Sequence, residues 1–551
     1  MKEYDFIVVG GGSAGCVLAS RLTEDPDVTV CLLEAGGKDS SPLIHTPVGM
    51  VAMMPTKINN WGFETIPQAG LNGRKGYQPR GKTLGGSSSI NAMMYARGHR
   101  YDYDLWASLG NVGWSYDDCL PYFKKAENNE IHRDEFHGQG GPLNVTNLRS
   151  PSDVLERYLA ACESIGVPRN PDINGAQQLG AMATQVTQIN GERCSAAKAY
   201  LTPHLDRPNL TVLTQATTHK ILFDGKRAVG VEYGQKGHTF QIRCKREVIL
   251  SAGAFGSPQL LLLSGVGAKK DLQPYGIQQV HSLPGVGENL QDHIDLVHTY
   301  RCSAKRDTFG VSLRMASELT KALPQWITQR TGKMSSNFAE GIGFLCSDDS
   351  VEIPDLEFVF VVAVVDDHAR KIHASHGFSS HVTLLRPKSV GRVKLNSANP
   401  YDVPHIDPAF FTHPEDMDIM IKGWKKQQQM LESSAFDDIR GESFYPVDAS
   451  DDKAIEQDIR NRADTQYHPV GTCKMGVASD PLAVVDHQLR VHGLAGLRVV
   501  DASIMPTLIG ANTNAPTIMI AEKIADAIKA HYAGLVWFAR RRKQCQWFNR
   551  Y

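Results

Sequence analysis

A glycine-rich segment near the N-terminus has the spacing of a dinucleotide-binding turn. Phe6–Val9 is an unbroken apolar run, as expected of a parallel strand buried on both faces, and residues 10–15 fit the pattern GxGxxG. In this pattern Gly10 permits the tight turn, Gly12 lets a pyrophosphate approach the backbone, and Gly15 lets the following helix pack closely on the strand. The start of that helix offers free N–H groups and a positive dipole to phosphates. The segment therefore predicts a dinucleotide site.

A carboxylate stands where the ribose of such a dinucleotide should bind. A second buried strand is expected over residues 28–33, and it ends at Glu34, which is 19 residues after Gly15. An acid at this position accepts hydrogen bonds from the ribose hydroxyls, and it disfavours the phosphorylated ribose of NADP. Glu34 does not separate NAD from FAD, so this first unit leaves both cofactors open.

Five further blocks carry a family resemblance. They resemble signatures of the glucose–methanol–choline (GMC) oxidoreductases, occur in family order, and look closest to the bacterial branch of choline dehydrogenases and aliphatic alcohol dehydrogenases. The resemblance extends from residue 4 to about residue 530 and implies an FAD enzyme that acts on alcohols. The blocks are residues 81–91, 253–267, 283–293, 500–506 and 512–517.

The resemblance implies that FAD is held without a covalent link. In some relatives the position of Ile90 is a histidine bonded to the flavin, and isoleucine cannot form that bond. A helix beginning at Pro516 is expected to point its positive end at the flavin, where hydride arrival leaves negative charge. The FAD-binding residues implied are Gly10, Gly12, Ser13, Ala14, Gly15, Glu34, Ala35, Gly85, Gly86, Ser88, Asn91, Ala92, Met93, Met94, Thr218, Ala252, Asp501, Ala502 and Thr513.

Two polar residues are the catalytic pair that the resemblance implies. Residues 467–473 resemble the active-site stretch of the family, with His468 as catalytic base. Imidazole titrates near working pH and can take the proton of an alcohol, and Pro469 restricts the backbone of His468 to extended angles. Asn512 follows 44 residues later, where some relatives carry a second histidine. Its amide can hold the substrate oxygen but cannot act as a second base.

The sequence narrows the choice of alcohol. Glu340 lies at a position that, in choline-oxidising relatives, faces the trimethylammonium group; aliphatic-alcohol relatives also carry this acid, so a buried structural role is the equal alternative. Tyr467 is the second expected substrate contact. Val470 stands where choline dehydrogenases tend to have cysteine, and residues 42–45 and 367–372 look more like the aliphatic-alcohol enzymes. We expect a medium-chain primary alcohol oxidised to its aldehyde, with choline as the alternative.

The C-terminal segment bears on the electron acceptor, which we expect to be a quinone or another non-oxygen acceptor. Residues 531–551 hold five Arg or Lys and no acid, interleaved with aromatic residues. Such a tail could lie at an anionic membrane surface, near quinone; a divergent tail without a role is the alternative. The start of the chain has no signal-peptide pattern, no apolar run has spanning length, and the ten cysteines form no CxxC. We therefore expect a cytoplasmic enzyme with reduced thiols, associated at most with the inner face of the membrane.

Composition and element pattern set the architecture that must position these residues. Among 551 residues, 58 Lys and Arg stand against 59 Asp and Glu, which argues against a nucleic-acid binder, and no motif indicates a metal site. We expect an α/β fold, in which a doubly wound, Rossmann-like FAD domain is interwoven with an α+β substrate domain built on an antiparallel sheet. Residues 358–365 and 391–395 are expected to be strands of that second sheet. The expected FAD segments are 1–150, 195–300 and 465–530, and the substrate segments are 151–194 and 301–464.

Three other functions fit parts of the pattern. A relative of the hydroxynitrile lyases would keep FAD without net redox chemistry, and a non-catalytic flavoprotein would keep it without turnover. Both predict that the flavin stays yellow when an alcohol is added without oxygen. An NAD enzyme is disfavoured, because the later blocks match FAD proteins. The presence of both His468 and Asn512 favours a dehydrogenase.

Overall fold

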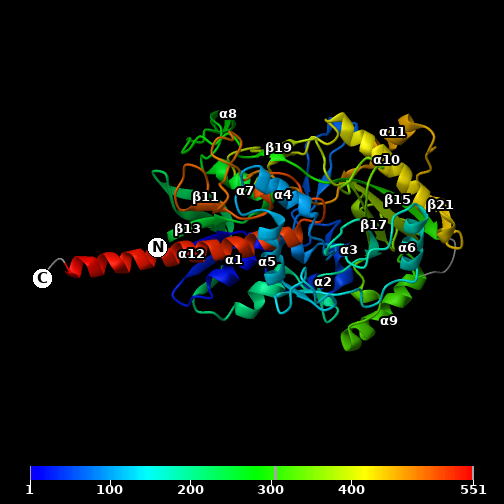
Figure 1. Ribbon diagram of the computed structural model, residues 1–551, viewed down its shortest axis with the longest axis horizontal. Coiled ribbons are helices and arrows are strands. Elements are labelled where there is room, and N and C mark those ends of the chain that lie inside the picture. The colour runs from blue at the N-terminus through cyan, green and yellow to red at the C-terminus, as the bar shows by residue number, and fades with distance from the viewer. Residues whose placement is uncertain (1, 303–306, 549–551) are drawn as a thin grey trace.

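Two seven-stranded sheets organise the chain (Figure 1). The computed structural model describes residues 2–302 and 307–548, with side chains described as far as residue 534. One sheet is built largely from the N-terminal half and the other from the middle of the chain, so each sheet gathers strands that are distant in sequence.

The first sheet is parallel at its centre. Strand β1 pairs in parallel with β2 on one side and with β13 on the other, and residues 6–9 of β1 are buried, as their unbroken apolar run predicts. β12 and β11 extend the sheet as an antiparallel hairpin, and β23 adds to β13 in parallel. The strands are β1 Glu3–Val9, β2 Val30–Leu33, β10 Leu210–Leu213, β11 Thr217–Asp224, β12 Arg227–Gln235, β13 His238–Leu250 and β23 Leu497–Val499.

Helices from both ends of the chain cover this sheet. Helix α1 (Ser13–Leu22) packs along α12 (Asn514–Phe548), and α12 also contacts α5 (Tyr116–Ala126) (Figure 1). Helix α7 (Gly253–Leu263) directly follows β13. The N-termini of α1 and α12 lie against each other, where the Ser13 hydroxyl donates a hydrogen bond to Asn514 Oδ1 at 2.7 Å.

The second sheet is antiparallel throughout. Its order is β21-β15-β18-β17-β16-β7, with β22 paired to β15. Helices α6, α10 and α11 lie over this half of the molecule, and α9 lies at its periphery (Figure 1). The elements are β7 Gly180–Ala183, β15 Ile294–Cys302, β16 Ala339–Leu345, β17 Leu356–Val361, β18 Gly377–Leu384, β21 Arg440–Ser443, β22 Asp464–Thr465, α6 Leu155–Ser164, α9 Leu313–Gln329, α10 Pro414–Leu431 and α11 Asp452–Arg462.

Short elements connect the two halves. A three-stranded sheet in the order β14-β19-β20 joins segments far apart in sequence, and three two-stranded ladders complete the strands. The remaining α-helices and strands in the described part of the chain are α2 Pro42–His45, α3 Met50–Met53, α4 Arg100–Ser108, α8 Lys269–Leu272, β3 Phe63–Glu64, β4 Tyr77–Gln78, β5 Glu127–Asn129, β6 Leu143–Val145, β8 Gln188–Ile189, β9 Glu192–Arg193, β14 Glu288–Leu290, β19 Gly391–Lys394 and β20 His405–Asp407.

The predicted fold class is confirmed, and several element boundaries differ. The strand expected over 358–365 is β17, which ends at Val361. The strand expected over 391–395 is β19, which belongs to the small sheet, because an alternating pattern does not specify a partner strand. Helix α12 begins at Asn514, two residues before Pro516, and proline is tolerated there because first-turn N–H groups need no partner within the helix.

The C-terminal segment continues α12 as far as Phe548, so most of the expected tail is helical. Its basic and aromatic side chains from residue 535 on lie outside the described residues. The domain limits stay a prediction; β15 begins inside a segment expected in the FAD domain, yet pairs in the second sheet. Within the described part of the chain, no helix has the length and apolarity to cross a membrane. The nine cysteines described are free thiols.

Candidate active site

A cavity of about 590 Å³ lies between the two sheets and gathers most of the predicted site residues. Gly15, Gly85, Ser88 and Glu340 are the predicted residues that do not line it. The predicted residues on its wall are Gly10, Gly12, Ser13, Ala14, Glu34, Ala35, Gly86, Asn91, Ala92, Met93, Met94, Thr218, Ala252, Tyr467, His468, Asp501, Ala502, Asn512 and Thr513.

Two glycine-rich loops meet at one end of the cavity. A Cβ on Gly15 would lie 1.8 Å from the carbonyl oxygen of Gly10, so helix α1 approaches β1 more closely than any side chain permits. A Cβ on Gly86 would lie 2.7 Å from Gly12 Cα, so the second loop rests directly on the first. Helix α1 begins after Gly12 with no side-chain cap and no acid in its first turn. Its first N–H groups are therefore available to a pyrophosphate.

Glu34 is placed to bind a ribose beside these loops. One carboxylate oxygen accepts from Gly11 N and the other from Gly36 N, both at 2.8 Å. Each oxygen can accept a second hydrogen bond, which leaves room for ribose hydroxyls. These two hydrogen bonds fix the carboxyl group of Glu34 in position before any ligand arrives. Burial raises the pKa of Glu34 to about 7.

The segment Asn91–Met94 forms another wall of the cavity. Arg193, fully buried, donates to the Asn91 carbonyl at 2.7 Å and to Asn91 Oδ1 at 2.8 Å. Met93 has a positive φ of 59°, an uncommon conformation for a residue other than glycine. Ile90 is buried next to this segment and also lines the cavity. Arg193 was not singled out from the sequence, because an isolated arginine there carries no motif.

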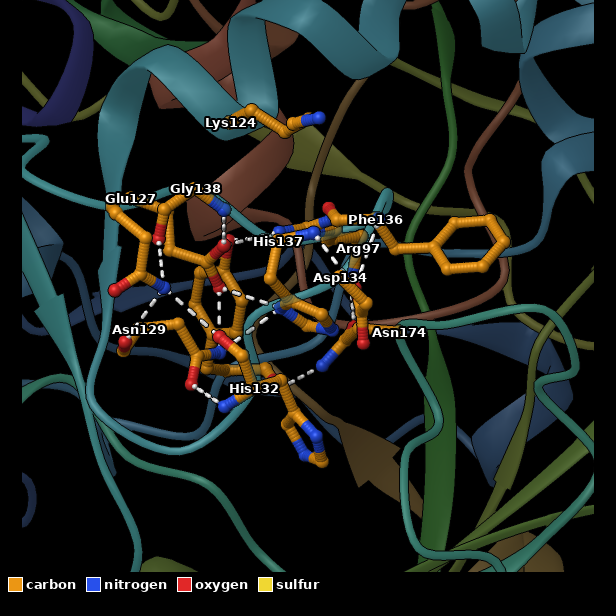
Figure 2. Close-up of polar contacts among 12 residues, drawn as sticks. Arg97, Lys124, Glu127, Asn129, His132, Asp134, Phe136, His137, Gly138 and Asn174 are labelled. Carbon is orange, nitrogen blue, oxygen red and sulfur yellow. Dashed lines mark hydrogen bonds and ion pairs between the residues drawn. The ribbon is translucent and has the colours of Figure 1, made fainter.

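A buried charge network anchors the chain that follows this segment (Figure 2). Arg97 donates to Glu127 Oε2 at 2.7 Å, and the His137 ring lies 3.2 Å from Glu127 and 2.9 Å from Asp172. Although burial alone lowers it, the hydrogen bonds to Asp172 and Glu127 raise the pKa of His137 to about 9. The network therefore pairs two anions, Glu127 and Asp172, with two cations, Arg97 and His137. Removing one partner would leave a buried charge unpaired, which is costly, so the network holds the chain around Arg97 in place.

One group of side chains beside this network has the spacing to ligate a metal ion: His132, Asp134 and Asp172. Both acids of this group already accept hydrogen bonds from other groups of the protein. Asp172 Oδ2 accepts from His137, and Asp134 Oδ1 accepts from backbone N–H groups. The absence of a metal site stays a prediction.

Unpartnered polar atoms on the cavity wall fit a polar cofactor and substrate. Thr218 Oγ1 and Asn512 Oδ1 are buried and have no hydrogen-bond partner among the described residues. Asp501, by contrast, is satisfied within the protein: it accepts from Gly253 N, Ser257 Oγ and Ser503. Two glycine loops, an open helix N-terminus, a fixed carboxylate and orphaned polar atoms together suit a dinucleotide such as FAD.

His468 lies on the cavity wall between two polar neighbours. Its Nδ1 is 2.9 Å from Nδ1 of His293, and its Nε2 is 3.3 Å from Nδ2 of Asn512. Its backbone N–H donates to Asp292 Oδ1 at 2.9 Å. Burial, followed by the nearby His293 and Arg80, holds the pKa of His468 well below its usual value. The imidazole is therefore neutral and able to accept a proton.

The contacts of His293 fix which nitrogen of His468 is basic. His293 Nε2 lies 3.0 Å from the carbonyl oxygen of Leu385, which can only accept, so Nε2 carries the proton. Burial lowers the pKa of His293 to about 3, so its Nδ1 is bare. Nδ1 of His468 must then donate to His293, which leaves the lone pair of His468 on Nε2, beside Asn512. His293 closes the block 283–293, but sequence reasoning gave it no role.

Tyr467 also lines the cavity, in a strained conformation with φ 72°. Its hydroxyl oxygen is 2.6 Å from Nδ1 of His368, a second histidine on the wall that sequence reasoning did not predict as a site residue. The carbonyl of Tyr467 accepts from half-buried Arg80 at 2.6 Å. Tyr467 is thus held through both its side chain and its backbone carbonyl.

Glu340 is placed away from the cavity. Its carboxylate accepts from Ser152 N at 2.6 Å and from the Ser336 hydroxyl at 3.0 Å, and the residue is 2% exposed. Burial raises its pKa to about 7. These contacts agree with a buried structural role for Glu340. The geometry does not favour the expected contact between Glu340 and the substrate.

Comparisons with known proteins identify relatives that span nearly the whole chain. Relatives of similar length are an alcohol dehydrogenase [acceptor] of Pseudomonas putida, 46% identical with 95% of both chains covered, and an oxygen-dependent choline dehydrogenase of Chromohalobacter salexigens, 43% identical with 96% and 95% covered. A solved structure, an FAD-dependent oxidoreductase from Chaetomium thermophilum, superimposes with a TM-score of 0.87 at 29% identity, with 96% of this chain and 100% of that chain covered.

Two family models, both described as GMC oxidoreductase, match this chain. They cover residues 4–295 and 387–521, which is most of the chain. The matched ranges contain the glycine loops, His468 and Asn512. The chain therefore belongs to the GMC oxidoreductase family and is an FAD-dependent oxidoreductase.

Proposed function

We propose that this enzyme oxidises a medium-chain primary aliphatic alcohol to its aldehyde and passes the electrons to a quinone or another non-oxygen acceptor. FAD, bound without a covalent link, would supply the hydride acceptor. The family fixes the class of reaction, and the choice of alcohol rests on the wall of the cavity.

One observation carries the choice of substrate: β17 and the segment that follows it present an apolar surface to the cavity. Val359 and Val361 on β17 line it, followed by Ala363–Val365, and Phe338 lies beside them. An alkyl chain buried here gains about 0.8 kcal/mol for each CH₂ removed from water. Among the described residues, Val359, Val361 and Ala363–Val365 contribute no carboxylate that would offset the desolvation of a quaternary ammonium group.

The acids that line the cavity are engaged elsewhere. Among the described residues these are Glu34, Asp402 and Asp501. Glu34 and Asp501 accept hydrogen bonds in the dinucleotide half, and Asp402 accepts from Ser397 and Asn399 in its own loop. A cationic substrate would need a carboxylate free to face it.

The chain's own groups would act on the alcohol as follows. Nε2 of His468 removes the hydroxyl proton, since its lone pair is held there by the hydrogen bond from Nδ1 to His293. The amide of Asn512, 3.3 Å from Nε2, holds the substrate oxygen as negative charge develops on it. The apolar wall orients the alkyl chain and excludes water. Removal of the proton makes loss of hydride from the carbinol carbon favourable.

An anaerobic bleaching assay tests this proposal. Flavin reduction is followed after mixing with 1-hexanol, 1-octanol, choline and 3,3-dimethylbutan-1-ol, the uncharged analogue of choline with the same shape. We expect rapid bleaching by the two linear alcohols and faster bleaching by 3,3-dimethylbutan-1-ol than by choline. A preference for choline over its neutral analogue would select choline oxidation, the second candidate, which is supported by the relatives named choline dehydrogenases. Flavin that stays oxidised with all four would reject dehydrogenase activity.

We also propose peripheral membrane contact at the inner face of the cytoplasmic membrane through residues 531–551, which would bring the enzyme to quinone. Five Arg or Lys without an acid support this proposal. Vesicles with and without an anionic lipid provide the test, with a variant in which Arg540, Arg541 and Arg542 are changed to Gln. We expect the variant to lose sedimentation with anionic vesicles. A second variant, Leu313→Gln with Ile327→Gln, changes two side chains that α9 exposes by 93% and 58% and provides the control; equal loss in that control would argue against the tail.

A further inference from the structure

Three consecutive residues hold a strained turn at the edge of the cavity. Asp367, His368 and Ala369 have φ values of 48°, 55° and 63°, and none is glycine. The left-handed conformation costs about 1–2 kcal/mol for each such residue. It persists only where the surrounding contacts outweigh that cost, and such strain is frequent at functional sites. His368 is the member of the turn whose contacts account for it.

The His368 ring is held on every side. Nε2 lies 3.0 Å from Asp464 Oδ2, and Nδ1 lies 2.6 Å from the hydroxyl oxygen of Tyr467. The rings of Tyr77 and Tyr467 pack edge-on against it, at 5.5 and 5.3 Å. The side chains of His368 and Asp464 are only 6% and 9% exposed. Asp464 also accepts from the backbone N–H groups of Tyr77 and Thr465.

These contacts determine where the protons lie. A carboxylate can only accept, so Nε2 of His368 carries a proton toward Asp464. Although burial opposes it, Asp464 raises the pKa of His368 and so favours the imidazolium. In the imidazolium, Nδ1–H donates to the Tyr467 oxygen, and the phenolic proton is free to be donated elsewhere. Among the residues that the structure describes, no acceptor for that proton is recorded, and Tyr467 and His368 both line the cavity.

We propose that Asp464 and His368 position Tyr467 so that its hydroxyl donates a hydrogen bond to an oxygen of the ligand in the cavity. His368 and Asp464 are positioning residues, and Tyr467 is the contact. A phenol that accepts from a cation is a stronger donor, because hydrogen bonds in a chain polarise one another. Such a donor would favour the substrate oxygen as it gains negative charge. The inference rests on the proposed function in requiring an alcohol as ligand.

The experiment separates ligand binding from turnover. The holoenzyme and the variants Tyr467→Phe, His368→Leu and His368→Gln are titrated with 1-hexanol, and the shift of the flavin absorption spectrum gives Kd, while anaerobic reduction gives the rate. We expect about tenfold weaker binding and about tenfold slower reduction in Tyr467→Phe and His368→Leu, each about 1.4 kcal/mol. His368→Gln, which keeps an N–H donor, should recover part of the loss. The double variant Tyr467→Phe with His368→Leu should lose little more than either single variant.

A tyrosine outside the cavity provides the control for these variants. Tyr445→Phe removes a similar tyrosine hydroxyl, 2.6 Å from Asp366, outside the cavity wall; it should leave Kd and rate unchanged. Additive losses in the double variant, or wild-type affinity in Tyr467→Phe, would overturn the inference. Tight binding of 1-hexanol without flavin reduction would reject the proposed function yet leave the binding comparison decisive. If 1-hexanol fails to bind the holoenzyme, both are overturned.

Discussion

Nδ1 of His293 lies 2.9 Å from Nδ1 of His468, and the two imidazole planes are nearly perpendicular, at 89°. Both rings are buried, and the far nitrogen of His293 is tied to the carbonyl of Leu385 at 3.0 Å. The backbone therefore determines the tautomer of His468, the proposed catalytic base, through an intervening histidine. A partner of this kind orients a functional imidazole and fixes its proton.

Replacing His293 should slow proton removal without emptying the cavity. His293→Leu leaves Nδ1 of His468 without an acceptor, so the reactive tautomer loses its advantage. We expect flavin reduction by 1-hexanol to slow by about 10–100-fold, as for other partners that orient a functional histidine. His293→Asn retains an amide oxygen and should recover part of the rate. A Leu variant with normal FAD content and wild-type rate would disprove the role.

The acid limb of the pH profile should lie below the usual histidine range. Burial, followed by His293 and Arg80, lowers the pKa of His468. A base with a lowered pKa keeps its lone pair to lower pH, so kcat/KM should stay level down to below about pH 6.5. His468→Gln should reduce the rate by about 10³-fold or more and abolish that limb. His238→Gln, at an exposed hairpin, is the control. An acid limb above about pH 7 would contradict the assignment.

FAD should leave the protein on acid precipitation. Ile90 lines the cavity and offers no nucleophile, although a histidine in that place bonds to flavin in some relatives. We expect the supernatant to contain one equivalent of FAD and the pellet to be colourless. Yellow colour and flavin fluorescence retained on the denatured chain in a gel would show a covalent link through another residue.

Local motifs were predictable from sequence, and contacts across the fold were not. The loop at Gly10–Gly15 and the acid at Glu34 were identified because turn geometry and strand length fix their spacing within one βαβ unit. His293 and His368 lie in segments that carry the family resemblance, but their contacts are with partners 175 and 99 residues away. The turn at His368 also breaks a local rule, since no residue there is glycine, and only tertiary contacts hold it.

Replacing Glu340 distinguishes a structural role from recognition of the substrate. The place of Glu340 in the family pattern suggested recognition of a cation, but both of its oxygens accept hydrogen bonds inside the protein. Glu340→Gln puts an amide donor against Ser152 N or Ser336, so we expect a loss of about 1–3 kcal/mol in the free energy of unfolding. KM for 1-hexanol and choline should change by less than about twofold. A large rise in KM for choline at unchanged Tm would restore the substrate role.

Glu357 should make the protein less stable as pH rises. It is fully buried on β17, opposite Thr383 of β18, and Thr383 in turn is opposite Asp295 of β15. Burial, only partly offset by the Gln466 amide, raises the pKa of Glu357 to about 8. The folded state therefore holds this proton more tightly than the unfolded chain, whose glutamates titrate near about 4.3. Its stabilising contribution is complete below that unfolded pKa and is lost as pH rises to about 8.

Glu357→Gln removes this titration while keeping the shape of the side chain. The variant and the wild type should have similar stability near about pH 4, and the variant should gain relative to the wild type between about pH 4.3 and about pH 8, by about 5 kcal/mol at most. Urea unfolding of the holoenzyme at several pH values measures the difference. Glu352→Gln, at an exposed position before the same strand, should show no such trend. If the wild type and the Glu357→Gln variant keep a constant difference from about pH 5 to about pH 8.5, the buried carboxyl is already ionised, and a cation or a water must stabilise it inside the sheet.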